Sequence, residues 1–439
     1  MESEEKPAIE NVSIESAEAA VQDLYDFRDH YFEHNGINKA PFRKREITNK
    51  LKETLATLDY IQASSENTSR CLYLRGKALN VKSEYDSMAE DALTKAVKLE
   101  PKLVEAWNCL GECYWKKGNV AAARNCFVGA LSHSKNKASL RNLSMVLRQI
   151  GSDSKERADN VRLSVEKAKE AVSLDITDGM SWYVLGNAYL SLFFSGSQSP
   201  QILKQCMSAY GQAEKDLVAA NNPDLHFNRA MAYKYQEEFK QSVENFRQAH
   251  KLDPGWVEAE ELCQRVLNYL TDTIQLAQGK GKLKTKRLQS MVNSLGEAEL
   301  GPYSGGSYTS AAGKTVDLDY TTLDKLTPEI NAGKVVVGRM VGSVQMDDPL
   351  PYTCAIVDKS DLCLPVTVYN MASGAGFVVG DAIAIPEPYV QVTDFTEDGK
   401  VFQFKSIRVD NPVVLAVNKK KLGASHLAPS VLSVTAISE

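Results

Sequence analysis

Apolar and small residues recur at helical spacing over the first two thirds of the chain. The clearest stretch carries them at these positions: Trp107, Leu110, Gly111, Tyr114, Ala123, Phe127 and Ala130. Each of its two runs has the i, i+3, i+4 and i+7 pattern of one helix face. Pro101 precedes the stretch and ends the helix before it. The pattern predicts a hairpin of two amphipathic helices that recurs along the chain.

The order W-x2-L-G-x2-Y followed by A-x3-F is the template of the tetratricopeptide repeat. Further copies centre on these residues: Leu79, Leu143, Trp182 and Tyr233. Two earlier helical stretches, 17–34 and 44–63, complete a degenerate first pair, and 257–276 closes the array. We therefore expect about six helix pairs in an α-solenoid over 16–277, after a disordered acidic segment at 1–15.

Two copies are longer than the template between their helices, at 147–164 and 189–206. The second insertion has a turn composition that includes Gly196 and Pro200. Insertions at equivalent points of a solenoid emerge on one face, which is often a binding face. Tolerated surface loops explain them equally well.

In repeats of this kind the first helix of each pair lines a concave trough. The exposed template positions give these candidate peptide-binding residues: Asn108, Glu112, Arg141, Met145, Arg148, Tyr183, Asn187, Asp224 and Phe227, with Tyr73 and Lys77 in an earlier copy. Arg148 can pair with a carboxylate or with carbonyl groups, and Asp224 with a basic side chain or an N-terminal amine. The set suits a short peptide of mixed charge, although a solvated polar face remains the alternative for any one residue.

Five positive charges follow the repeats: Lys280, Lys282, Lys284, Lys286 and Arg287. If the segment is extended, its alternate lysines share one side, and a short helix begins near Leu288. We interpret the cluster as a contact for the phosphate backbone, such as that of ribosomal RNA. A solvated linker and a weak nuclear-import signal are the alternatives.

Short β-branched runs replace the helical pattern after Val335. Five of them within 335–418, separated by turn signals such as Asp398-Gly399, predict a small OB-fold barrel. We expect 278–334 to be a basic helix and linker, and 419–439 to be a flexible tail. Aromatic residues that could stack on single-stranded nucleic acid are these: Tyr369, Phe377, Tyr389, Phe402 and Phe404.

Composition excludes several classes of protein. The net charge of −5 argues against a protein that binds long nucleic acid over its whole surface. The eight scattered cysteines contain no C-x2-C pair, which argues against a zinc ribbon. We expect buried free thiols, no cofactor, no metal, no membrane contact and no enzymatic activity. A location in the cytoplasm, the nucleus or both is expected.

The segments VEAWNCLGECYWKKGNVAAARNCF, SWYVLGNAYLSLFFS, GKGKLKTKRLQSM and AIPEP occur in this order. Together they resemble the tetratricopeptide repeat protein five family, over nearly the whole chain. The resemblance implies a non-enzymatic adaptor that captures the N-terminus of nascent tubulin on ribosomes and recruits an mRNA-decay adaptor. Its alternative implication is a stress-responsive nuclear cofactor that joins a tumour-suppressor transcription factor to an acetyltransferase coactivator complex, with DNA contact by the OB-fold.

Overall fold

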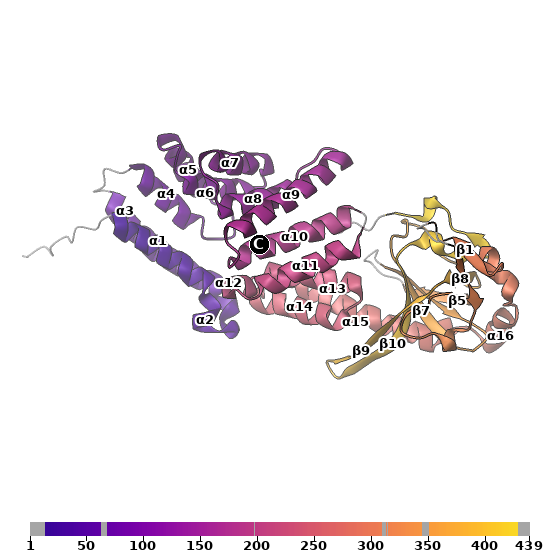
Figure 1. Cartoon of the computed structure of the whole chain (residues 1–439). Helices are drawn as coiled ribbons and strands as arrows, with labels where there is room; N and C mark the ends of the chain where they lie inside the picture. Colours follow the sequence, from indigo (N-terminus) through magenta and orange to yellow (C-terminus); the bar gives the residue numbers. More distant parts are fainter. Residues whose placement is uncertain are drawn as a thin grey trace, which may run out of the picture. The chain divides into compact units, whose positions relative to one another are not determined.

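A computed structural model describes residues 14–62, 68–196, 198–309, 313, 315–344 and 351–428. By internal contacts these residues form two compact units, shown in Figure 1. The helical unit contains residues up to 232 and 244–260, and the barrel unit contains 233–243 and the residues from 261 onward. The first thirteen residues and 429–439, which include most of the predicted disordered and flexible ends, lie outside the described residues.

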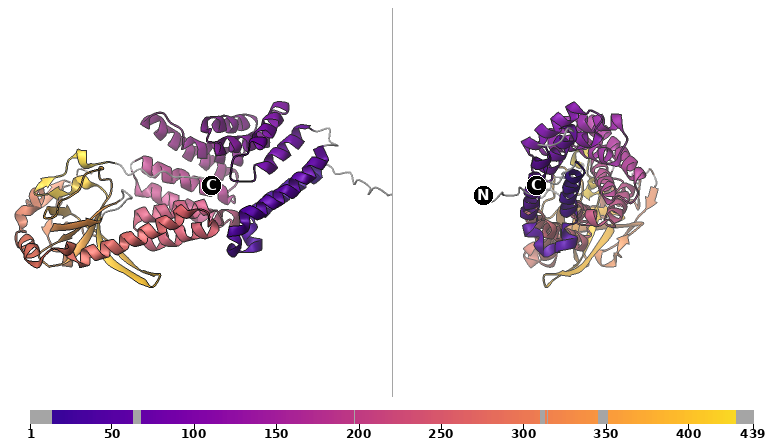
Figure 2. Two further views of the ribbon diagram at one scale, coloured as in Figure 1. Left: turned by 180° about the vertical axis from the view of Figure 1, so that it is seen from behind. Right: turned by 90° about the vertical axis from the view of Figure 1, so that its left-hand side faces the viewer.

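The predicted stack of helix pairs is confirmed, and its curvature is visible end-on in Figure 2. The pairs are α1 (Ile14–Asp29) with α3 (Arg43–Gln62), α4 (Thr68–Leu79) with α5 (Ser87–Leu99), α6 (Val104–Lys116) with α7 (Val120–His133), α8 (Lys137–Leu147) with α9 (Ser154–Leu174), α10 (Gly179–Ser195) with α11 (Pro200–Ala213), and α13 (Pro223–Gln236) with α14 (Phe239–Leu252). The shorter α2 (Tyr31–Asn35) and η1 (Ile37–Phe42) connect the two helices of the first pair, α12 (Leu217–Ala220) connects the last two pairs, and α15 (Val257–Gln278) follows the last pair.

Glycine in the first helix lets a large side chain of the second helix approach closely. A Cβ added at Gly111 would lie 2.4 Å from the Phe127 ring, and one at Gly186 would lie 2.5 Å from the Tyr210 ring. The template tryptophan fixes the preceding turn, because Trp107 Nε1 donates to the Pro101 carbonyl at 2.8 Å. The template residues therefore have packing roles.

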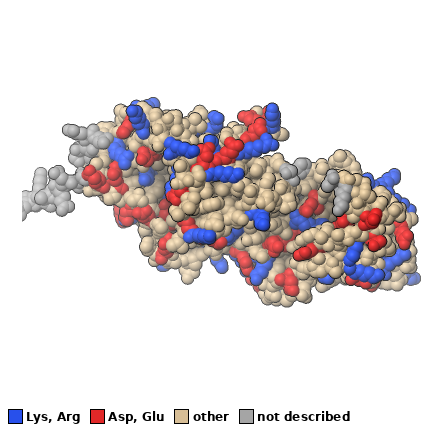
Figure 3. Space-filling view, in the orientation of Figure 1, with Lys and Arg blue, Asp and Glu red and all other residues tan. Residues whose placement is uncertain are grey.

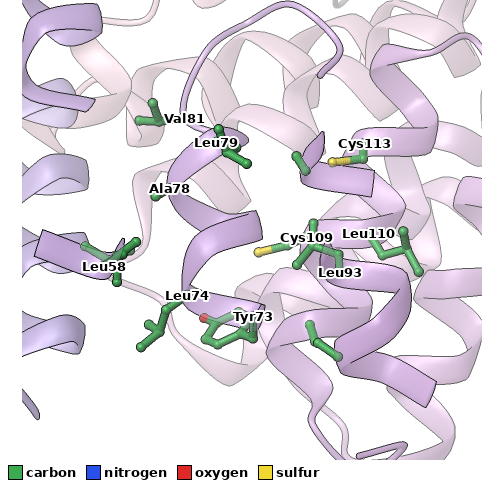
Figure 4. Packing of buried hydrophobic residues seen from close by; sticks show 14 of the residues in the cluster. Leu58, Tyr73, Leu74, Ala78, Leu79, Val81, Leu93, Cys109, Leu110 and Cys113 are labelled. Atoms are coloured by element: carbon green, nitrogen blue, oxygen red, sulfur yellow. The ribbon is translucent and has the colours of Figure 1, made fainter. Parts of the chain in front are cut away.

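The first pairs share one apolar core, part of which is shown in Figure 4. Leu74 of α4, Leu93 of α5 and Leu110 of α6 are each less than 5% exposed. All eight cysteines are buried and outside any disulfide, as expected, and Cys109 and Cys113 belong to this core. Burial raises the pKa of both these thiols, so they stay protonated and behave as small apolar groups.

The first of the two insertions is mostly helix rather than loop. Helix α9 begins at Ser154, so it is 21 residues long and takes up most of the extra sequence. In the second insertion α10 extends to Ser195, and Pro200 starts α11 at its first turn. Proline is favoured there because its missing N–H has no partner in a first helical turn.

The predicted β-strands of the C-terminal third are confirmed. The principal sheet contains β5 (Lys334–Val344), β6 (Tyr352–Val357), β7 (Cys363–Val368), β8 (Ala382–Pro386), β9 (Tyr389–Glu397) and β10 (Lys400–Val409), with short strands β3 (Asp319–Tyr320), β4 (Glu329–Ile330), β11 (Ala416–Val417) and β12 (Lys420–Lys421). Its order is β12-β11-β8-β5-β6-β7-β10-β9-β4, and β3 pairs with β5. Asp398 and Gly399, both at positive φ, turn β9 into β10.

The segment expected to be a linker belongs to the barrel unit. Helix α16 (Thr285–Asn293) and η3 (Glu297–Tyr303) pack on the sheet, and Leu295 and Leu300 share a core with Val335. The ten residues after Asn418 also differ from the expected flexible tail, because they include β12 and a bridge from Leu427 to Met371. The folded unit is therefore larger than 335–418.

None of the helices that the structure describes is long and apolar enough to cross a bilayer.

Candidate peptide-binding and basic sites

Four of the predicted trough residues come together around one tyrosine. Arg148 follows α8 as its C-terminal cap, and Asp224 lies in the first turn of α13. Tyr183 and Asn187 lie one turn apart on α10. Both charged groups act on the Tyr183 hydroxyl, and burial followed by the Asp224 carboxylate raises the pKa of Tyr183. The ring is therefore a neutral hydrogen-bonding group where α8, α10 and α13 meet.

Arg148 carries a guanidinium that the described part of the chain leaves without a carboxylate. No Asp or Glu oxygen among these residues lies within 4.0 Å of it, and its buried Nε has no hydrogen-bond partner there. Burial lowers the pKa of Arg148, and only Tyr183 and Tyr210 act in the opposite direction. Arginine nonetheless stays charged in proteins. A ligand oxygen placed here would compensate the positive charge of Arg148, which no carboxylate of the described residues compensates.

Asn187 is held in place beside the Tyr183 hydroxyl. It is fully buried, and its Oδ1 accepts hydrogen bonds from Tyr210 Oη at 2.7 Å and from Asn228 Nδ2 at 3.3 Å. Asp224 is 8% exposed. Tyr183 is 3% exposed, so three of these four side chains are buried and Arg148 is the half-buried one. Their fixed positions lower the ordering cost of binding a ligand at Arg148.

Glu112 supplies a second charge to the trough, on α6. Its two carboxylate oxygens accept from the side-chain amides of Asn142 and Asn80, each at 3.1 Å. Within the described residues it forms no ion pair, so its negative charge is hydrogen-bonded but not neutralised. Asn108, one turn earlier, is buried and accepts from Ser139 Oγ at 2.6 Å.

The other three predicted trough residues have structural partners or partial burial. Arg141 forms an ion pair with Asp178 at 2.8 Å, and Asp178 in turn caps α10. Met145 is half-buried on α8. Phe227 was expected to line the trough but is 4% exposed, because its ring stacks on Trp256 with a centroid separation of 4.3 Å. Phe227 therefore packs the core of the helical unit.

Two residues of α1 were not found from the sequence. Tyr25 donates from its Oη to the Lys77 carbonyl at 2.9 Å, and the Arg28 guanidinium lies 4.3 Å from the Tyr25 ring centroid. Cys109 and Glu112 of α6 also act on Tyr25. The first pair lacks the Trp and Gly of the template, so its inner face could not be placed by register.

The basic residues are held on the barrel unit. Lys280 pairs with Asp361 at 2.6 Å, whereas the other four side chains are exposed and have no ion pair within the described residues: Lys282, Lys284, Lys286 and Arg287. Figure 3 shows basic side chains at the end of the unit that carries α16 in Figure 1. Four unpaired cations on a short segment make a phosphate-binding surface physically reasonable.

The segment before α16 is not extended, which corrects the expected alternation of its lysines. Lys280, Gly281 and Lys282 all have positive φ and form the turn η2 (Lys280–Lys282). A Cβ at Gly281 would lie only 2.0 Å from the Val341 carbonyl oxygen, so the turn lies directly on β5. Leu283 and Leu288 pack against Val341 in the same cluster. The cations are therefore fixed in position rather than carried on a loose linker.

The aromatic residues considered for nucleic-acid stacking are divided between core and surface. Tyr369 and Phe402 are 1% and 3% exposed, which leaves Tyr389 as an exposed ring and Phe377 and Phe404 half-buried. Among the described residues no group of three or more His, Cys, Asp or Glu side chains is placed to hold a metal ion.

Comparison with known proteins follows the same two-part division. The family model of the tetratricopeptide repeat protein 5 OB fold domain matches residues 317–431, and tetratricopeptide repeat models match 104–136 and 223–256. The chain is 46% identical to tetratricopeptide repeat protein 5 of Bos taurus over 96% of each chain. It is 45% identical to the protein of that name from Homo sapiens over 98% of each chain.

The OB fold match begins at residue 317, which agrees with the larger barrel unit described above. Proteins built from tetratricopeptide repeats are generally non-enzymatic interaction scaffolds, and this chain carries such repeats. With relatives at this level of identity over nearly its full length, the chain belongs to the tetratricopeptide repeat protein 5 family.

Proposed function

We propose that this protein is a non-enzymatic adaptor whose helical trough binds a short peptide of mixed charge. The observation that carries the proposal is the Arg148 guanidinium, which is charged, partly buried and without a carboxylate in the described residues. A cation in such a place is costly unless a ligand supplies an anion or carbonyl groups. Asp224 and Glu112 add negative charge for a basic side chain of the same ligand.

By family resemblance, the ligand is the N-terminus of nascent tubulin, which contains both acidic and arginine residues. An acidic side chain would pair with Arg148, and the negative charge of Asp224, which is 8% exposed, would attract the peptide arginine without direct contact. Arginine and carboxylate form two parallel hydrogen bonds, so the pairing at Arg148 would also fix the register of the peptide.

The four exposed cations at Lys282, Lys284, Lys286 and Arg287 would dock on ribosomal RNA phosphates. Ribosome contact would hold the trough near the emerging chain, and the second contact would then form at high effective concentration. Recruitment of an mRNA-decay adaptor would couple capture to decay of tubulin mRNA. Such an activity would take place in the cytoplasm, and the nuclear cofactor role remains the alternative.

Peptide capture is tested with Arg148→Ala in the full chain. We expect crosslinking to ribosome-bound tubulin nascent chains to fall at least about tenfold, the effect of losing a charge-assisted hydrogen bond worth ~1.5–3 kcal/mol. Arg162→Ala is the matched control, because Arg162 is exposed on α9 and pairs with nearby Asp159. Equal crosslinking by the two variants would remove Arg148 from the binding site.

Ribosome docking is tested separately with Lys284→Glu combined with Lys286→Glu. We expect co-sedimentation with ribosomes to weaken and the salt dependence of the remaining binding to become shallower. The control reverses two exposed lysines of α5, Lys95 and Lys98, and so changes the net charge equally. If both double variants sediment alike at moderate salt, the docking role of the cluster is refuted.

A further inference from the structure

The trough contains a second cluster of polar and charged groups, outside the Arg148 site. It is built from α1 and α4, the first helices of the first two pairs. Lys77 Nζ lies 5.0 Å from the Tyr25 ring centroid and 5.9 Å from the Tyr73 ring centroid. Arg28 lies over the same Tyr25 ring. Two cations therefore share one aromatic surface.

The Lys77 ammonium has ring faces but no hydrogen-bond acceptor. Within the part of the chain that the structure describes, its Nζ forms no hydrogen bond and no ion pair. An aromatic face attracts a cation, yet it leaves the N–H donors of an ammonium group largely unused. Arg28 differs, because it pairs with Asp29 at 2.7 Å. The unused donors of Lys77 are those that a carboxylate would satisfy.

The protein fixes the position of Lys77 from two helices. The Tyr25 hydroxyl of α1 binds the Lys77 carbonyl, and Tyr73, one turn earlier on α4, is 4% exposed. Lys77 itself is half-buried. A side chain held in this way loses little further rotamer freedom on binding, which favours a specific contact over a loose one.

We infer that Lys77, next to the Tyr25 and Tyr73 rings, forms a second anion-binding subsite. It would bind an acidic side chain of the peptide that is bound at Arg148. This inference rests on the proposed function and extends it from one charged contact to two. Glu112 of α6 acts on both Tyr25 and Arg28 and offsets part of the positive charge of Arg28. The charge of Lys77 is thus the one that favours Glu or Asp over a neutral side chain.

The spacing of the helices sets the distance between the two subsites. Lys77 lies on α4 and Arg148 follows α8, with α6 between them. Packed helices are about 8–10 Å apart, so two steps cover roughly 20 Å. An extended peptide rises about 3.3 Å per residue. The acidic side chain at Lys77 should therefore be roughly six residues from the one at Arg148.

The test uses the full-length protein and two fluorescein-labelled peptides that share one Arg and one Glu at their first positions. One peptide has a second Glu about six residues further on, and the other has Gln there. We expect the change from Glu to Gln to weaken binding to the wild type about fivefold, because a partly buried ion pair stabilises a complex more than an exposed ion pair does. Fluorescence anisotropy at two salt concentrations measures both affinities.

Lys77→Met keeps the length of the side chain and the backbone bond to Tyr25, so the variant should keep its fold. We expect it to bind both peptides equally, at the affinity of the wild type for the Gln peptide, and we expect Lys77→Arg to restore the preference. An equal preference for Glu in the wild type and in Lys77→Met would overturn the inference. Failure of the proposed function looks different, because Arg148→Ala would then bind both peptides as well as the wild type.

Discussion

Replacing Gly281 by alanine tests whether the basic segment acts through its fixed position as well as its charge. Gly281 has a φ of +67°, a conformation in which alanine costs about 1–2 kcal/mol. Its new Cβ would lie 2.0 Å from the Val341 carbonyl oxygen, whereas real Cβ atoms stay at least 3.0 Å from such atoms. The turn must therefore move by about 1 Å away from β5, and overpacking of this kind costs about 1–3 kcal/mol.

The two contributions together predict a loss of about 2–5 kcal/mol in the unfolding free energy of the barrel unit. For a unit of this size the melting temperature should fall by about 10 °C. Ribosome co-sedimentation should also weaken, although no charge has changed, because the turn that places Lys282 and Lys284 no longer fits against the sheet.

Gly296→Ala is the control in the same unit, because it has an ordinary extended backbone and nothing lies within 4 Å of the added methyl group. Scanning calorimetry and co-sedimentation of both variants are compared with the wild type. If Gly281→Ala melts and sediments like Gly296→Ala, the rigid attachment of the basic segment is refuted.

Three further predictions concern buried polar groups. Burial lowers the pKa of His226, so stability relative to His226→Gln should be lost as the pH falls below about 6.5, measured by urea unfolding. Burial raises the pKa of Glu237, so the stability of the wild type relative to Glu237→Gln should be greatest below about pH 4.5 and should fall as the pH rises above that value, which the same assay measures. Tyr210→Phe removes the 2.7 Å hydrogen bond to Asn187 and should lower the free energy of unfolding by about 1–3 kcal/mol, measured by thermal unfolding. An unchanged free energy of unfolding would show that this hydrogen bond contributes nothing to stability.

The solenoid could be predicted because its packing residues are local in sequence. Gly111 and Phe127 are sixteen residues apart, and each close approach of this kind recurs with the repeat. The strands were predictable for a similar reason, since alternation and the Asp398-Gly399 turn are also local signals. Long-range packing gave no such signal: Leu295 and Leu300 reach the barrel core although their segment reads as a linker.

The proximity of Arg148, Tyr183 and Asp224 could be predicted, because the template sets the phase of each helix. Their role in peptide binding stays a prediction. Burial could not be read from phase alone, so Phe227 was assigned to the trough although it stacks on Trp256. The contact of Lys77 with the Tyr25 ring could not be predicted, because Tyr25 belongs to another helix that the template does not reach.

The groups around Tyr183 come from three consecutive first helices, α8, α10 and α13. The separation between positive and negative charge is thus a property of the stack and not of any single repeat. If the trough binds a peptide as proposed, this fixed separation would reject a sequence with the correct residues one position too near or too far. A mutation that alters the pitch between these helices would then change which chains are read, even though every contacting side chain is intact.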